Sequence, residues 1–228
     1  MADFRNYQNI VIKVGTSTLA HATGKLNIQR TQELCRVLSD LKNAGHEVIL
    51  VSSGAIGMGV GKLALKEKPK DIPTKQAAAS VGQCELMYAY DRIFSEYGYS
   101  VGQILLTGSD FSNPERVSNF TNTMERLLEL NVLPIINEND TVATEEIKVG
   151  DNDTLSALVA VNTKADLLVI LSDIDGLYTV DPKKDETAKR IPLVKEITSE
   201  LLKIAGGEGS SLGTGGMKTM RNMPGIWH

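Results

Sequence analysis

Five short segments of this chain consist mostly of apolar residues, without the regular alternation of apolar and polar residues that half-exposed strands show. They are residues 9–14, 48–51, 101–106, 132–136 and 167–171. A strand can be apolar on both sides only where both faces of its sheet are covered, which is typical of parallel sheets. Helical patterns separate the segments, and no internal repeat or interdomain linker interrupts them. The sequence therefore predicts one α/β domain around a mostly parallel sheet.

The helical patterns between these segments carry start and stop signals. Asn27 can cap one helix, and Gly45 stands where a C-terminal glycine cap belongs. The predicted apolar stripe of this helix consists of Leu34, Val37, Leu38 and Leu41. Asn113 and Pro114 predict the start of another helix, with proline at the first helical position. Such helices are suited to cover the faces of the sheet.

The composition argues against several classes of protein. The chain has 228 residues and a formal net charge of −4, which argues against a nucleic-acid-binding protein. No apolar run approaches the roughly 20 residues that span a membrane, and the first residues lack the apolar region of a signal peptide. We interpret Cys35 and Cys84 as reduced core thiols of a cytoplasmic protein. The three histidines show no metal-ligand spacing, so no metal site is predicted.

Polar residues follow the fourth apolar segment, where a predicted strand ends. Residues 137–140 read NEND, and residues 151–153 read DND just before a helical pattern. In parallel α/β sheets, ligands bind outside the carboxyl ends of the strands. Residues 151–153 could serve only as a helix cap, although one aspartate is enough for that purpose. We expect the two groups to bind a ligand that carries ammonium and hydroxyl or amide groups.

Lys13 is a charged residue within an otherwise apolar strand. A charge this close to the core is costly unless it is paired, so one interpretation is a lysine held by a salt bridge. The other interpretation is a cation directed at a phosphate group from the carboxyl end of the strand. Asp173 follows the apolar segment 167–171 and is expected at the same edge, although it could be only a turn former.

Two glycine-rich segments could contact phosphate groups. Residues 52–61 lie between a strand and a helix, where free backbone amides and the helix dipole favour an anion, although tight packing would also explain the glycines. Their spacing matches neither a Walker A loop nor GxGxxG. Residues 206–216 read GGEGSSLGTGG, which predicts either a disordered linker or a loop that orders when nucleotide binds. Lys218, just after this segment, favours the second interpretation.

The chain offers lysines and glycine-rich turns, but no activated nucleophile and no general base. Transfer of a phosphoryl group to a carboxylate needs no base, because the acceptor is already ionised. The difficulty of that reaction is electrostatic, since two anions must approach each other. Positioning, cations and backbone amides are then sufficient for catalysis.

Several long motifs resemble the glutamate 5-kinases of the amino acid kinase family. They are IVIKVGTS, VILVSSGAI, LPIINENDTVATEEIKVGDNDTLSAL, LLVILSDIDGLYTVDP and GTGGMKT, in this order over nearly the whole chain. The resemblance implies a three-layer αβα sandwich with a mostly parallel central sheet. It also implies ATP-dependent phosphorylation of the γ-carboxylate of L-glutamate, the first step of proline biosynthesis. Homo-oligomers inhibited by proline are common among such kinases, and Mg²⁺ would enter with ATP, held mainly by its phosphates.

The resemblance also implies roles for individual residues. Lys13 would neutralise charge on the transferred phosphoryl group, Asp153 would orient the catalytic lysines, and Lys218 is a further candidate catalytic residue. The residues implied for glutamate are Ser53, Gly54, Ala55, Asp140 and Asn152. Those implied for the nucleotide are Lys13, Ser172, Asp173, Thr214, Gly215, Gly216, Met217, Lys218, Thr219 and Met220.

The chain departs from the family pattern in two places. The pattern has a lysine where this chain has Met220, and loss of one charge-stabilising group typically lowers the rate by about 10²–10³. The pattern also continues where this chain ends in RNMPGIWH, which predicts a kinase domain over residues 1–228 that is truncated or altered at its C-terminus and lacks the RNA-binding-like domain of some relatives. Two alternatives follow, a catalytically weak protein that binds glutamate or proline, and a kinase for another anionic acceptor such as N-acetylglutamate.

Overall fold

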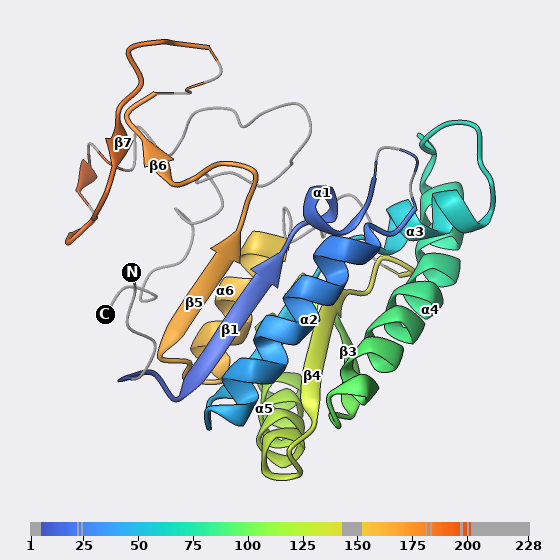
Figure 1. Ribbon diagram of the computed structural model, residues 1–228, viewed down its shortest axis with the longest axis horizontal. Helices are drawn as coiled ribbons and strands as arrows, with labels where there is room; N and C mark the ends of the chain where they lie inside the picture. The colour runs from blue at the N-terminus through green and yellow to red at the C-terminus, as the bar shows by residue number, and fades with distance from the viewer. Residues whose placement is uncertain are drawn as a thin grey trace.

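The computed structural model describes residues 6–142 and 152–201, except residues 22, 24, 181, 183, 197 and 200. Its centre is a sheet of five parallel strands in the order β3-β4-β2-β1-β5 (Figure 1). The strands are β1 (Asn9–Val14), β2 (Glu47–Ser52), β3 (Val101–Leu106), β4 (Leu133–Glu138) and β5 (Leu167–Leu171). The parallel sheet expected from the apolar segments is confirmed.

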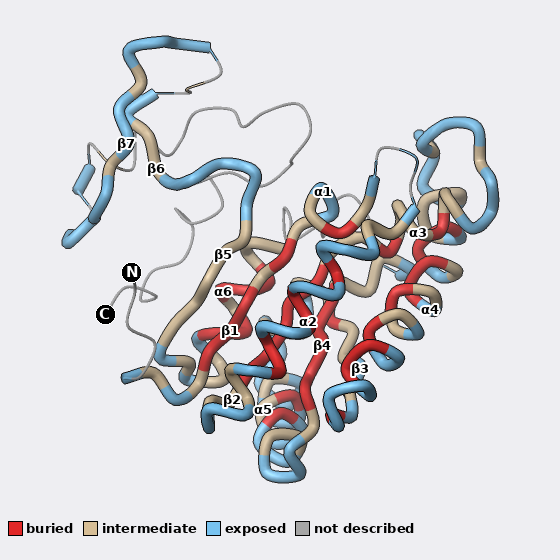
Figure 2. Tube along the Cα trace, viewed as in Figure 1, coloured by how far each residue is buried: buried red, intermediate tan, exposed pale blue. Residues whose placement is uncertain are grey.

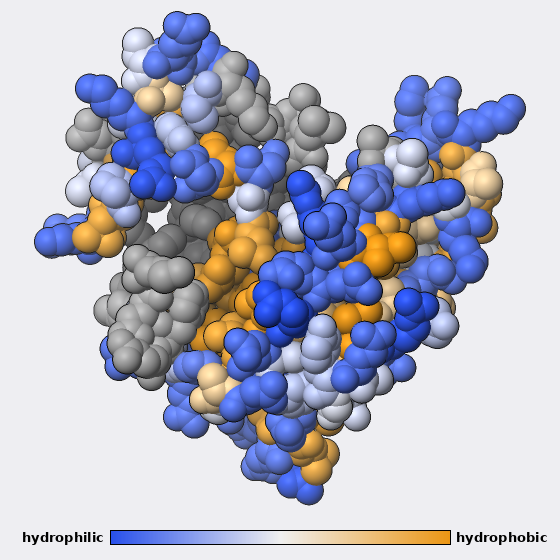
Figure 3. Space-filling model, in the orientation of Figure 1, coloured by the Kyte–Doolittle hydropathy of each residue, from blue (hydrophilic) through white to orange (hydrophobic). Residues whose placement is uncertain are grey.

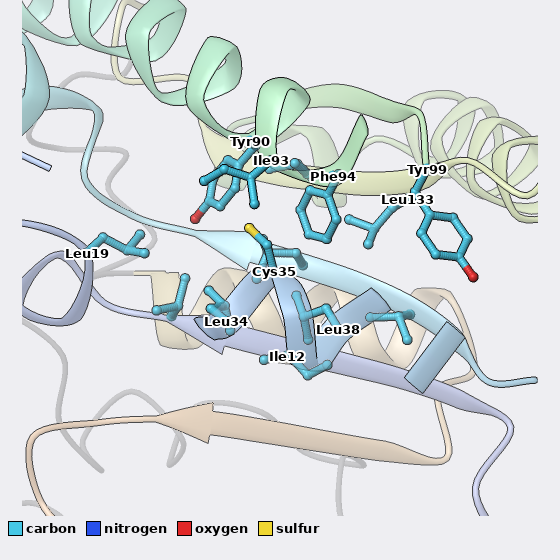
Figure 4. Close-up of a cluster of buried hydrophobic side chains, with 14 of the residues drawn as sticks. Ile12, Leu19, Leu34, Cys35, Leu38, Tyr90, Ile93, Phe94, Tyr99 and Leu133 are labelled. Carbon is cyan, nitrogen blue, oxygen red and sulfur yellow. The ribbon is translucent and has the colours of Figure 1, made fainter. Parts of the chain in front are cut away.

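Helices cover both faces of the sheet and make a three-layer αβα sandwich, as predicted. The helices α2 (Ile28–Asn43) and α4 (Ile72–Glu96) pack on one face, where their apolar side chains meet Ile10 and Ile12 of β1 (Figure 4). The helices α5 (Pro114–Glu129) and α6 (Asn152–Asn162) pack on the other, around Val11. Because consecutive residues of a strand point to opposite faces, β1 needs apolar residues throughout.

The connections between strands identify where a ligand site should form. The chain passes from β1 through β2 to β3 by way of α2 and α4, and returns through β4 to β5 by way of α5 and α6. Right-handed crossovers that run in opposite directions along a sheet place their helices on opposite faces. The neighbouring strands β2 and β4 are therefore followed by helices on opposite faces, and ligands bind at the carboxyl ends of such a pair.

Shorter elements complete the described part of the chain. They are α1 (Thr16–Leu19), α3 (Ala55–Lys62), the 3₁₀ helix η2 (Gly108–Ser112), β6 (Leu177–Tyr178) and β7 (Arg190–Ile191). The strands β6 and β7 pair with each other as a separate antiparallel sheet. None of the described helices is both long enough and apolar enough to cross a membrane.

The predicted helix caps are present. Asn27 Oδ1 accepts a hydrogen bond from Arg30 N at 3.1 Å, and Gly45 follows the end of α2 with a φ of +97°. Asn113 Oδ1 likewise accepts hydrogen bonds from the first turn of α5 at 3.0 and 3.2 Å. Side-chain oxygens at these positions satisfy amide groups that have no partner within the helix.

Two sequence-based expectations about the core are wrong. Val37 is 42% exposed, whereas Cys35 is fully buried, because the buried stripe of α2 includes Leu34, Cys35 and Leu38 and Val37 turns away from it. Burial also raises the pKa of the Cys35 thiol to about 12, as expected for an unreactive core cysteine. Cys84 is exposed on α4 and is therefore not a core thiol.

Burial is not uniform across the sheet. Figure 2 shows buried residues concentrated in the inner strands and the inward side of α4. The edge strand β5 is only half-buried at all five of its residues. On the face seen in Figure 3, apolar residues accordingly gather beside the hydrophilic surface of α2, where β5 lies in Figure 1. Among the described residues, β5 is thus less covered than its neighbour β1.

The carboxylate of Asp166 fixes the start of β1 beside the loop that precedes β5. Its Oδ2 accepts hydrogen bonds from the backbone N–H groups of Asn9 at 2.9 Å and Gln8 at 2.8 Å. The bond from Asn9, followed by the bond from Gln8, lowers the pKa of Asp166 below its ordinary value. A carboxylate with a lowered pKa stabilises the fold above its unfolded pKa, and this contribution is lost as the pH falls through the folded pKa.

We expect the replacement Asp166→Asn to make folding less sensitive to acid. Asparagine keeps an acceptor oxygen but does not titrate, so the stabilisation that wild type loses below about pH 4 is absent from the variant at every pH. Thermal unfolding of both proteins between neutral and acidic pH tests this expectation. The midpoint difference should shrink as the pH falls, and a constant difference would contradict the assignment.

Candidate active site

The ion pair between Lys13 and Asp153 connects the end of β1 to the start of α6. Lys13 Nζ lies 2.5 Å from Asp153 Oδ1, and the two side chains are only 12% and 18% exposed. Asp153 lies in the first turn of α6, where the helix dipole favours a carboxylate. The pairing expected of a nearly buried lysine is present, and it holds the ammonium group near the carboxyl edge of the sheet.

Asn152 joins the carboxyl ends of β2 and β4. Its Nδ2 donates to Ser53 Oγ at 2.6 Å, and to Asn137 Oδ1 and the Ser52 carbonyl oxygen at 3.1 Å each. Two hydrogens shared by three acceptors fix the orientation of this amide. Asn152 Oδ1, in contrast, is buried and has no hydrogen-bond partner among the residues that the structure describes. Buried acceptors are usually satisfied, so this oxygen is suited to an N–H donor of a ligand.

Gly54 turns the chain from β2 into α3. Its φ of +112° lies in the left-handed region, which suits glycine. Gly54 is the N-cap residue of α3 and makes no side-chain hydrogen bond to its first turn, so the amides there are suited to another partner. Ser53 N donates to the carbonyl oxygen of Val14 at 3.1 Å, which holds this turn beside the end of β1. The expected substrate residues Ser53, Gly54 and Ala55 therefore lie close to the strand that carries Lys13.

The helix α4 supports this turn through direct contact with the backbone of α3. A Cβ atom at Gly82 would lie 1.7 Å from the carbonyl oxygen of Ala55. A Cβ atom at Gly59 would similarly lie 1.8 Å from the carbonyl oxygen of Ala78. The close approach of the two helices thus requires glycine at both positions, and it fixes the start of α3.

A second layer of polar residues, not predicted from the sequence, lies beneath the site. Gln83 Oε1 accepts a hydrogen bond from Asn137 Nδ2 at 2.9 Å, and both residues are buried. Ser52 Oγ lies 2.8 Å from the hydroxyl of Tyr90. The only signal in the sequence was a glutamine at a helical position between small and apolar residues, next to Gly82.

The remaining described candidates lie near the same edge of the sheet but without a demonstrated link to Asn152. Asp140 is half-buried two residues after β4, and Asn139 N donates to the carbonyl oxygen of Leu106 at 2.7 Å. Ser172 and Asp173 are exposed just after β5, and Ser172 Oγ donates to Asp173 Oδ1 at 3.4 Å. Because the last residue of β5 is paired with Val14, they follow the strand beside Lys13.

Several expected site residues lie outside the described part of the chain. They are Asp151, Thr214, Gly215, Gly216, Met217, Lys218, Thr219 and Met220. Their proposed contacts with substrate or nucleotide stay predictions.

The site combines one nearly buried cation, uncapped backbone amides and an amide oxygen suited to a donor. Such groups can bring an anionic donor and an amino-acid acceptor together without a nucleophile of the protein. Within residues 6–142 and 152–201, apart from the gaps given above, no three His, Cys, Asp or Glu side chains form a group that could hold a metal ion. A divalent cation brought in by phosphate groups remains compatible with these residues.

The chain, with this fold and this arrangement of side chains at the sheet edge, belongs to a known class of enzymes. The sequence model of the Amino acid kinase family matches residues 8–222, and this chain therefore belongs to the amino acid kinase family. The UMP kinase from Ureaplasma parvum has a similar structure, with a TM-score of 0.58 at 18% identity over 86% of this chain and 81% of that chain. At this identity, the similarity supports the fold alone.

More similar relatives carry one particular name. The glutamate 5-kinase of Clostridium tetani is 56% identical over 215 residues, which cover 94% of this chain and 80% of the relative. That of Clostridium acetobutylicum is 56% identical over 214 residues, with the same two coverages. That of Carboxydothermus hydrogenoformans is 55% identical over 216 residues, which cover 94% of this chain but 58% of the relative.

Proposed function

We propose that this chain phosphorylates the γ-carboxylate of L-glutamate with ATP and forms L-glutamyl 5-phosphate, the first step of proline biosynthesis. The observation that carries the proposal is the ion pair of Lys13 with Asp153, next to Asn152, which donates a hydrogen bond to Ser53. Relatives named glutamate 5-kinase are 55–56% identical over 94% of the chain, which supports the same activity.

The proposed reaction needs no general base. A γ-carboxylate oxygen of glutamate attacks the γ-phosphorus of ATP, and the bond from that phosphorus to the bridging oxygen breaks to release ADP. Negative charge on the transferred phosphoryl group is neutralised by Lys13, which Asp153 holds in place. The uncapped amides at the start of α3 are suited to a further anionic group of the substrates.

The proposed glutamate site lies between the ends of β2 and β4. Asn152 Oδ1 accepts from the ammonium group of glutamate, because it is buried and lacks a described partner. Ser53 and Gly54 contribute the turn before α3, Ala55 contributes the first residue of that helix, and Asp140 contributes a carboxylate from the loop after β4. A carboxylate and an amide oxygen together suit an ammonium ion.

The proposed nucleotide site lies on the other side of Lys13. It includes Ser172 and Asp173 after β5, together with residues 214–220 outside the described residues. Lys218 is proposed as a second cation at the phosphoryl group. Mg²⁺ is proposed to be held mainly by the ATP phosphates, where it would neutralise part of their charge.

Further properties are proposed from the family resemblance alone. They are a homo-oligomeric state, inhibition by proline, a cytoplasmic location and an amino acid kinase domain over residues 1–228. Size-exclusion chromatography with light scattering, in the presence and absence of proline, tests the oligomeric state. The hydroxamate assay described below, with and without proline, tests the inhibition.

Trapping of the acyl phosphate with hydroxylamine tests the proposed activity. The chain should form γ-glutamyl hydroxamate from ATP and L-glutamate, and should form none when glutamate is replaced by N-acetylglutamate or a nucleoside monophosphate. Release of ADP, followed in parallel, should depend on glutamate in the same way. Hydroxamate no greater than in a protein-free blank would refute the proposed function.

A further inference from the structure

Gln83 is a buried amide in a helix whose other buried side chains are small or apolar, apart from the hydroxyl of Tyr90. It is 7% exposed, and it lies between Ala79 and Leu86 on the buried side of α4. An amide in such a place lowers stability unless its polar atoms find partners. Gln83 Oε1 has one partner, Asn137 Nδ2, at 2.9 Å. Gln83 Nε2 is buried without a partner among the described residues, so packing alone does not explain the glutamine.

The hydrogen bond that Asn137 donates to Gln83 determines which way the amide of Asn137 faces. Since Asn137 Nδ2 donates to Gln83, Asn137 Oδ1 must point the other way. There it accepts from Glu138 N at 2.9 Å and from Asn152 Nδ2 at 3.1 Å. If the Asn137 amide were reversed, its NH₂ group would face the NH₂ group of Asn152, and two donors repel each other.

The orientation of Asn152 depends in turn on this acceptor. With Nδ2 held by Ser53, Ser52 and Asn137, the oxygen of Asn152 is directed away from these three acceptors, and it is buried without a partner among the described residues. We propose that Gln83 is a positioning residue for the acceptor substrate, acting through Asn137 on Asn152. The proposal rests on the proposed function, since it assigns a role within the glutamate site.

Replacement of Gln83 should weaken glutamate binding without affecting ATP. Methionine and leucine are similar in volume and suit a helix, so Gln83→Met and Gln83→Leu are both made, in case one of them does not fold. Each should raise the KM for glutamate, and the glutamate Kd measured by calorimetry, about tenfold, with the KM for ATP within about twofold of wild type. A merely structural role would lower the thermal midpoint but would not separate the two substrates.

Two further variants distinguish positioning from general destabilisation. In an Asn137→Ala background, Gln83→Met should cause no further loss of glutamate affinity, because the residue through which it acts is gone. Tyr99→Phe is the control, since it removes a hydrogen bond of 2.7 Å to Asn43 Oδ1 that lies away from the carboxyl edge of the sheet. It should lower the thermal midpoint and leave the KM for glutamate unchanged.

The outcomes separate the two proposals. Wild-type chain that binds no glutamate in the calorimeter overturns both the proposed function and the role of Gln83. Wild-type chain that binds glutamate, together with an unchanged KM and Kd in both Gln83 variants, overturns the role of Gln83 alone. Additive losses in the Asn137→Ala background also overturn it.

Discussion

Replacement of Gly82 by alanine is expected to destabilise the protein and to abolish most of its activity. The added Cβ atom would lie 1.7 Å from the carbonyl oxygen of Ala55 and 2.4 Å from Gly59 N, and neither backbone atom can rotate away. The helices α3 and α4 must therefore separate. Overpacking of this kind costs about 1–3 kcal/mol or more. The start of α3 and the turn at Gly54 move with Ala55, so the substrate site is displaced as well.

Urea unfolding and the hydroxamate assay measure the two effects of Gly82→Ala separately. Gly57→Ala is the matched control for stability, because among the described residues its Cβ atom would meet only Thr16 Cγ2, at an ordinary contact distance of 3.5 Å. Since alanine has a higher helix propensity than glycine, Gly57→Ala should keep or raise the free energy of unfolding. A Gly82→Ala variant as stable as wild type would contradict the close helix contact.

Replacement of Lys13 by methionine should lower kcat by about 10²–10³, because a preorganised cation is lost from the phosphoryl group. The KM for glutamate should change much less, since its proposed contacts are made by Asn152 and its neighbours. Asp153→Asn should also lower kcat, because the ammonium group of Lys13 loses the carboxylate 2.5 Å away that holds it. The two losses should not add in the double variant, because both act through one ion pair.

Lys62→Met is the matched control for the removal of a lysine from an ion pair. Lys62 Nζ lies 2.7 Å from Glu85 Oε1, but its side chain is 57% exposed, and exposed ion pairs contribute little. This variant should keep wild-type kcat in the hydroxamate assay. A Lys13→Met variant that keeps more than about a tenth of wild-type kcat would contradict the proposed role of Lys13.

The sheet and its neighbouring helices could be predicted because the signals for them are local. The segment 9–14 is apolar on both sides, which indicates a strand between two layers, and its predicted bounds are those of β1. Asn27 and Asn113 likewise mark helix starts through bonds to residues two or three positions later. Val37 was misplaced because it adjoins the true stripe of α2, and only packing decides which side of a helix is buried.

The site could be predicted only in outline. Polar residues after β4 and before α6 indicated the edge of the sheet at which a ligand binds. The contacts of Asn152 with Ser53 and of Asn137 with Gln83 span 99 and 54 residues. They depend on the strand order and on the rotation of α4, whose Gly82 packs with Gly59 of α3 and fixes the distance between the two helices. One sequence does not specify the strand order, the rotation of α4 or its distance from α3. Gln83 was therefore not identified from the sequence.

A crystal structure with glutamate and a non-hydrolysable ATP analogue tests the central claim most directly. We expect the glutamate ammonium group within hydrogen-bonding distance of Asn152 Oδ1, and its γ-carboxylate facing the γ-phosphate of the analogue. Lys13 Nζ should contact that phosphate while it remains beside Asp153. Glutamate bound away from the ends of β2 and β4, or a γ-phosphate out of reach of Lys13, would contradict the account.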